Sequence, residues 1–173
     1  DALPISFYAN YATTYCGIDN AVAAGFFVGF IYLGAICTNL FLGMLGLLSL
    51  KNKYILSKFL SISAILLIIS FDSYWSFFLA SFLLGTSKGT RMIVVPAAVK
   101  RLSGLHDSTS YYAVGPILTL PFALILPLAF GKFLDIFSDL QADSYKIAFG
   151  IAIVLILGTL LSILNTNFEN PVG

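Results

Sequence analysis

Five uninterrupted apolar runs, each long enough to cross a lipid bilayer as a helix, decide what this chain can fold into. They cover residues 21–50, 55–71, 74–99, 111–131 and 147–164. A helix rises about 1.5 Å per residue, so about 20 residues cross the roughly 30 Å of hydrocarbon in a membrane. The runs lack the alternation of apolar and polar residues that marks the strands of a membrane barrel. The sequence therefore predicts an all-α transmembrane fold with five membrane-spanning helices.

The composition requires a lipid environment. Hydrophobic residues make up 59% of the chain and charged residues 10%, whereas soluble domains are about 25% charged. Too few polar residues remain to form a surface in water. The net charge of +1 and the scattered nine Lys and Arg residues argue against a nucleic acid partner. Cys16 and Cys37 have no metal-ligand spacing, and we expect neither a metal nor a cofactor.

The first 20 residues differ from the rest of the chain. Because the chain begins at Asp1 and not at a methionine, we expect it to be a piece of a longer protein. Residues 6–16, rich in Tyr and Ala, could form the outer end of a further helix, followed by an outer loop. Residues 1–5 resemble a translated sequencing adaptor and receive no weight. Residues 21–173 then form a C-terminal transmembrane helical domain.

Basic residues mark which connections face the cytoplasm. Those flanking the first and third connections are Lys51, Lys53, Lys58, Lys100 and Arg101. The second connection offers only Asp72, and residues 1–20 contain no Lys or Arg. We therefore expect a multi-pass protein of the plasma (inner) membrane, with its N-terminus outside and its C-terminus in the cytoplasm.

Two cations, Lys88 and Arg91, lie past the middle of the third run. Spaced i, i+3, they are expected to share a helix face. A charge at that depth costs roughly 2.5–3.5 kcal/mol to insert, so such residues usually face water or a partner charge. One interpretation is a cavity-lining pair that binds an anionic group of a substrate, with Asn39 of the first run as a further polar residue facing the bundle. The alternative is that the side chains, Arg91 above all, only extend to the cytoplasmic headgroups.

A serine hydrolase pattern also falls in the third run, since Gly85, Ser87 and Gly89 have the spacing found around a nucleophilic serine. Such a serine needs a histidine base, and the only histidine, His106, falls in a loop. Together with Ser81, the glycines recur every four residues, which lets another helix approach closely. We therefore expect helix packing here and no enzyme.

The fourth run contains four potential hinge residues, Gly115, Pro116, Pro121 and Pro127. Each proline removes a backbone donor and tends to kink or break a helix. In transporters, broken helices mark gating segments, although prolines are also commoner in membrane helices than in soluble ones. Both interpretations stay open for these residues.

The layout resembles the C-terminal half of the major facilitator superfamily of transporters, from its eighth to its twelfth helix. Two local patterns carry the resemblance beyond the layout. The segment with Gly46, Lys51 and Lys53 resembles the family's cytoplasmic loop motif, although Leu50 stands where the family has an acidic residue. Residues 131–135 resemble the glycine-to-aspartate pattern that often ends its eleventh helix.

The resemblance implies that the third run lines the central cavity, with Lys88 facing the substrate, and that the first and fourth runs are gate helices. It implies secondary active transport of a small solute by alternating access. The implied partners are that small-molecule solute, a coupling ion where an ion gradient drives transport, the lipid bilayer and the N-terminal half of the same protein. The alternative is a non-transporting integral membrane subunit or scaffold, in which Lys88 pairs with a carboxylate of a partner.

Overall fold

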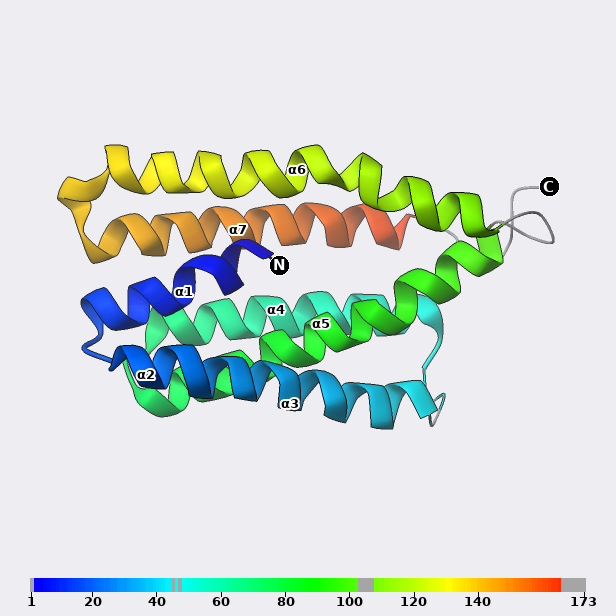
Figure 1. Ribbon diagram of the computed structural model, residues 1–173, viewed down its shortest axis with the longest axis horizontal. Coiled ribbons are helices and arrows are strands. Elements are labelled where there is room, and N and C mark those ends of the chain that lie inside the picture. The colour runs from blue at the N-terminus through cyan, green and yellow to red at the C-terminus, as the bar shows by residue number, and fades with distance from the viewer. Residues whose placement is uncertain (1, 45, 47, 103–107, 166–173) are drawn as a thin grey trace.

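The computed structural model describes residues 2–44, 46, 48–102 and 108–165, and every regular element in these ranges is helical. The helices run side by side along the long axis of the molecule (Figure 1). In chain order they are α1 (Ala2–Tyr15), α2 (Asn20–Val22), α3 (Val28–Thr38), α4 (Leu50–Ser70), α5 (Tyr74–Leu102), α6 (Ser108–Ile136) and α7 (Ala142–Leu164). For these residues the all-α prediction is confirmed.

The helices α2 and α3 belong to one rod, Asn20–Met44. A π-helical segment, Ala23–Phe27, joins them, and a second one, Asn39–Met44, extends α3. A short 3-10 helix, Ser138–Leu140, lies between α6 and α7.

Four helices within the described residues are long and apolar enough to cross a membrane. They are Asn20–Met44, Leu50–Ser70, Tyr112–Ile136 and Ala142–Leu164. The third expected span, residues 74–99, does form a helix, α5, which has 29 residues. Lys88, Arg91 and several Ser, Thr and Gly residues make α5 less apolar than the other four. By helix length and composition, the chain is a multi-pass membrane protein.

The first two helix boundaries differ from those expected. The first rod ends at Met44 instead of residue 50, and α4 begins at Leu50 instead of residue 55. The hydroxyl of Ser49 caps α4, since it accepts a 3.3 Å hydrogen bond from the backbone N–H of Asn52. Gly46 has a φ of +60°, a conformation that glycine adopts without strain. The Ser49 cap and the left-handed Gly46 therefore separate the first rod from α4. Neither changes the hydropathy of the run, so the hydropathy pattern did not reveal this boundary.

The connections alternate between the two ends of the bundle (Figure 1). One end, called here the Asp72 end, carries the connections at residues 16–19, 71–73 and 137–141. The opposite end, called here the Lys51 end, carries the start of α4, the end of α5, the start of α6 and the end of α7. The connections are therefore grouped as the sequence predicted.

The first helix, α1, packs into the bundle at the Asp72 end. Tyr8 and Tyr11 are almost fully buried, and the Tyr11 ring meets Phe149 of α7 edge to face. The Tyr11 hydroxyl donates a 3.2 Å hydrogen bond to a carboxylate oxygen of Asp72. Most of residues 6–16 are thus helical, as part of α1, and these contacts hold α1 against α7 and the α4–α5 hairpin.

The fifth helix, α5, packs most extensively against α3 and α4. Glycines allow its close approach to α3: a Cβ atom on Gly85 would overlap the backbone of Ile31. A Cβ on Gly89 would lie 2.9 Å from the Cα of Ala35, and one on Gly34 would overlap the α5 backbone. The small-residue interpretation of the third run is confirmed at these glycines.

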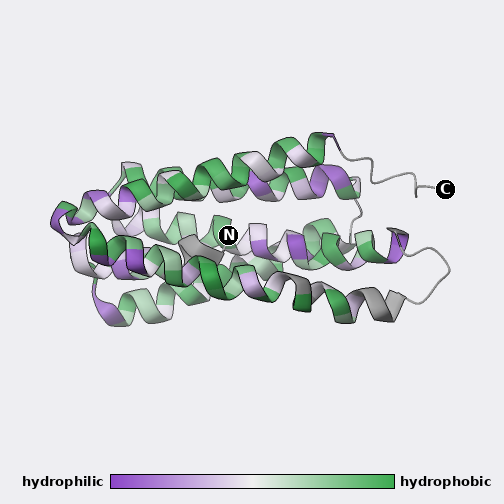
Figure 2. Cartoon of the chain, turned by 90° about the horizontal axis from the view of Figure 1, so that it is seen from above, coloured by the Kyte–Doolittle hydropathy of each residue, from purple (hydrophilic) through white to green (hydrophobic). Residues whose placement is uncertain are grey.

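The outside of the bundle is apolar. Hydrophobic residues follow most of the length of the helices (Figure 2). The helix α6 is the extreme case, since none of its most apolar window is buried. It runs as one helix to Ile136 through its prolines, and both interpretations of these residues stay open. Only lipid or further apolar protein can cover such a surface.

Candidate functional site

Lys88 lies at the middle of α5, on the seam between α5 and α3. Its ammonium nitrogen is 5.7 Å from the centroid of the Tyr32 ring on α3, within the range of a cation–π contact. Lys88 is half-buried, while Tyr32 is 60% exposed. The charge therefore lies at half the height of the bundle and close to its surface.

Asn39 lies on the same side of α3 as Tyr32, because seven residues amount to nearly two helical turns. It is exposed and begins the π-helical segment Asn39–Met44. Lys88, Tyr32 and Asn39 together are called here the Lys88 face. This face offers a cation, a phenol and an amide within an apolar surface, a combination suited to an anionic or zwitterionic small molecule.

Arg91 has different surroundings. It interacts electrostatically with Tyr54 of α4, and Lys58 of α4 is its charged neighbour. Lys88 and Arg91 therefore have different neighbours, on α3 and on α4, because α5 packs between these two helices. That the two cations share a helix face stays a prediction.

The two lysines expected in a cytoplasmic loop belong to the first turn of α4. The Lys53 ammonium donates a 2.7 Å hydrogen bond to the carbonyl oxygen of Leu42, and that of Lys51 donates a 2.9 Å bond to the carbonyl oxygen of Leu164. Of the three residues of the expected loop motif, only Gly46 lies in the connection itself. Both lysines bind the C-terminal ends of other helices, where backbone carbonyls lack helical partners.

Ser87 is completely buried, and its hydroxyl lies 2.7 Å from that of Ser61 on α4. This contact joins α4 and α5, which favours helix packing over a nucleophile. His106, the residue weighed as a possible base, lies outside the described residues.

The four potential hinge residues lie on α6, away from α3. The helix α6 packs against α1, α5 and α7. Gly115 and Pro127 are half-buried and Pro121 is exposed, while for Pro116 only the backbone is described. The hydroxyl of Tyr112 donates a 2.6 Å hydrogen bond to the carbonyl oxygen of Pro96 and so ties α6 to α5. The structure thus does not gather the hinge residues and the Lys88 face into one site.

Sequence reasoning did not identify two aromatic neighbours of the cations, Tyr32 and Tyr54. Tyr32 had a signal, because a tyrosine deep inside an apolar run needs a partner for its hydroxyl or ring. Tyr54 lies just before the second expected run, where a tyrosine is typical of a helix end. Lys58, one of the basic residues that flank the first connection, has only 6% of its surface exposed, and its ammonium lies 4.9 Å from the Tyr54 ring centroid.

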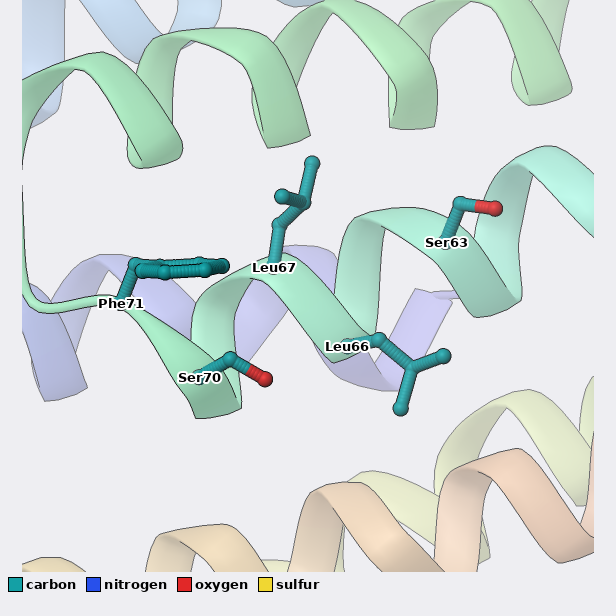
Figure 3. Close-up of a pocket in the computed structure, with 5 residues that line it drawn as sticks. All are labelled: Ser63, Leu66, Leu67, Ser70 and Phe71. Atoms are coloured by element: carbon teal, nitrogen blue, oxygen red, sulfur yellow. The ribbon is translucent and has the colours of Figure 1, made fainter.

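A shallow depression of about 320 Å³ lies along α4 near the Asp72 end (Figure 3). Its lining residues are Ser63, Leu66, Leu67, Ser70 and Phe71. Without a charged group, it offers less chemistry than the Lys88 face. No protein family model, curated protein or solved structure matches this chain.

Proposed function

We propose that this chain forms most of the C-terminal half of a secondary active transporter, which moves a small solute by alternating access. The observation that carries the proposal is the Lys88 face. It holds a cation half-buried at the middle of the bundle, where solute sites of such transporters lie.

Membrane energetics supports a functional role for Lys88. The helix α5 packs along α3 and α4, two segments that can cross a membrane, so α5 crosses with them and places Lys88 near the bilayer centre. A charge at that depth is costly and normally serves a substrate path. The sequence has no Asp or Glu between residues 73 and 106, so a carboxylate for Lys88 comes from elsewhere, and a carboxylate or phosphate of the solute fits this need.

A continuous α6 is compatible with a role as a moving gate helix. It has few neighbours in the bundle and contains Gly115, Pro121 and Pro127, and a weakly packed helix can shift at low cost. On this proposal the N-terminal half of the same protein completes the cavity, and an ion gradient or the solute's own gradient drives transport.

The test is solute uptake by cells that express the full-length protein with Lys88→Ala. We expect uptake to fall to background while the amount of protein in the membrane stays unchanged. Lys100→Ala, which removes an exposed cation at the Lys51 end, is the matched control and should transport normally. These 173 residues alone, reconstituted in liposomes, should carry no specific flux.

The second candidate is a membrane subunit or scaffold, and the large uncovered apolar surface of α6 favours it. In that case the wild type itself shows no solute uptake, and Lys88→Ala instead causes the loss of a bound partner protein. Co-purification of partners with the wild type and with Lys88→Ala distinguishes the two functions.

A further inference from the structure

The helices α3 and α5 run in the same direction along the bundle, and this sets the level of Lys88 (Figure 1). A Cβ on Gly85 would overlap the backbone of Ile31, and a Cβ on Gly89, four residues later, would meet Ala35. A step along α5 is therefore matched by an equal step along α3. Lys88 directly precedes Gly89, so its backbone lies at nearly the same level as Ala35.

The polar groups around Lys88 lie at two separate levels. From its backbone the lysine side chain leans toward the start of α5, and its ammonium lies 5.7 Å from the centroid of the Tyr32 ring. Asn39 follows Tyr32 by seven residues on the same side of α3, which places it about 10 Å further toward the Lys51 end. The cation and the amide are therefore separated along the bundle.

The surface between the two polar levels is apolar. Ile36 lies one turn after Tyr32 and one turn before Asn39, and 55% of its surface is exposed. Met92 lies one turn after Lys88 on α5 and is 62% exposed. Its flexible thioether can adapt to different shapes. The five residues Lys88, Tyr32, Ile36, Met92 and Asn39 are called here the Lys88 strip.

A compact anion such as inorganic phosphate matches only one end of the Lys88 strip. It meets a charge at Lys88, but its other oxygens would face Ile36 and Met92, where they would lose water without gaining a partner. An organic anion with an apolar body avoids this cost, because the body covers the two exposed apolar side chains. The order of cation, apolar surface and amide thus favours an elongated molecule.

We infer that the solute of the Lys88 face is an elongated organic anion. Its negative group binds Lys88, its apolar or aromatic body covers Ile36 and Met92, and a hydrogen-bonding group at its far end reaches Asn39. An aromatic body can also stack against the exposed ring of Tyr32. This inference rests on the proposed function, because it specifies the substrate class of the same site.

The test is calorimetric binding of four probes to the full-length protein in lipid nanodiscs. The probe para-hydroxyphenylpropanoate has all three features, phenylpropanoate lacks the far hydroxyl, propanoate lacks the body, and para-ethylphenol lacks the charge. We expect the first to bind most tightly and phenylpropanoate to bind about 2–10-fold more weakly, as the loss of one hydrogen bond predicts. Propanoate and para-ethylphenol should each bind at least about tenfold more weakly than the first probe.

Asn39→Leu tests the far end of the Lys88 strip. It should abolish the difference between the two aromatic acids and leave the affinity for phenylpropanoate within about twofold of the wild type. Asn165→Leu is the matched control, because it removes an exposed amide at the end of α7, and it should keep the wild-type order of affinities. An equal loss for both aromatic acids in folded Asn39→Leu would show that Asn39 does not contact the far group.

Lys88→Met and Met92→Ala test the other two parts of the strip. In Lys88→Met the aromatic acids should bind no better than para-ethylphenol. Met92→Ala should weaken both aromatic acids about threefold or more and leave propanoate unchanged, since propanoate has no body to cover the methionine. Circular dichroism identifies any variant that fails to fold, and the order of affinities in the wild type then still tests the inference.

The outcomes separate this inference from the proposed function. If uptake depends on Lys88 but the wild type binds none of the probes, or binds all four equally, transport stands and the elongated organic anion is wrong. If the expected order of affinities is found in a protein without uptake, the Lys88 strip is confirmed as a binding site and transport is wrong.

Discussion

The ammonium nitrogen of Lys53 lies 2.7 Å from the carbonyl oxygen of Leu42, and only 6% of the lysine surface is exposed. Leu42 belongs to the π-helical segment that ends the first rod, where carbonyls have no further helical turn to accept from. With the bond from Lys51 to Leu164, the first turn of α4 binds the ends of two other helices. These two hydrogen bonds tie α4 to the first rod and to α7, and so stabilise the bundle at the Lys51 end.

Lys53→Met keeps most of the apolar stem and removes the donor. Because it leaves a carbonyl in a partly buried contact without its partner, we expect the unfolding free energy to fall by about 1–3 kcal/mol. Unfolding titrations with sodium dodecyl sulfate in mixed micelles measure this change. Lys100→Met is the control, and an equal effect of both substitutions would show that the contact with Leu42 contributes nothing specific.

Gly85→Ala tests the close approach of α5 and α3. The added methyl group meets the backbone of Ile31, which cannot move aside as a side chain can, so we expect a loss of about 1–3 kcal/mol. Gly150→Ala in α7 is the matched control, because a Cβ there has no neighbour within 4 Å. The same unfolding titration should find Gly150→Ala neutral or slightly stabilised, and similar losses at both glycines would contradict the packing assigned to Gly85.

Ser61→Ala and Ser87→Ala test the buried hydroxyl pair through a double-mutant cycle. Hydrogen bonds between helices inside membranes have coupling energies of about 0.6 kcal/mol on average and about 1.7 at most, and we expect a value in that range. Both single variants should transport as the wild type does. Loss of function in Ser87→Ala without loss of stability would instead revive a catalytic role for this serine.

The sequence was sufficient for the helical class and for which connections share an end, because hydrophobic length and basic loops act over whole segments. It was not sufficient for the break between the first two helices. The Ser49 cap and the left-handed Gly46 depend on hydrogen bonds and torsion angles, which a hydropathy average does not contain. Lys51 and Lys53 look like loop residues for the same reason.

The candidate site was foreseen in part. Lys88 and Asn39 stand out because polar residues inside apolar runs are few. Tyr32 was missed although it lies in the middle of the first run, because only its contact with Lys88 across two helices marks it as part of the site. Which residues lie beside Lys88 and Arg91 depends on which helices flank α5, and spacing along one helix carries no information about that.

Cys16 should be a slow nucleophile. Burial first, and then the 3.4 Å hydrogen bond to Asp72, raise the pKa of its thiol from 9.0 to about 11. At pH 9 the thiolate fraction falls from about one half to roughly 1%, so alkylation should be roughly 50-fold slower than in the unfolded chain. Rates with iodoacetamide in a Cys37→Ser background measure this ratio, and equal rates in folded and unfolded protein would contradict it.

Single cysteines placed at the two ends of the bundle test the orientation. In a background with Cys16→Ser and Cys37→Ser, Asp139→Cys adds a thiol at the Asp72 end and Leu48→Cys adds one at the Lys51 end, both at exposed positions. The excess of basic residues at the Lys51 end predicts that this end faces the cytoplasm. A membrane-impermeant maleimide applied to intact cells should therefore label Asp139→Cys, and it should label Leu48→Cys only after the membrane is permeabilised. The reverse labelling pattern would show that the protein has the opposite orientation in the membrane. Labelling of both cysteines in intact cells would show that the two ends do not lie on opposite sides.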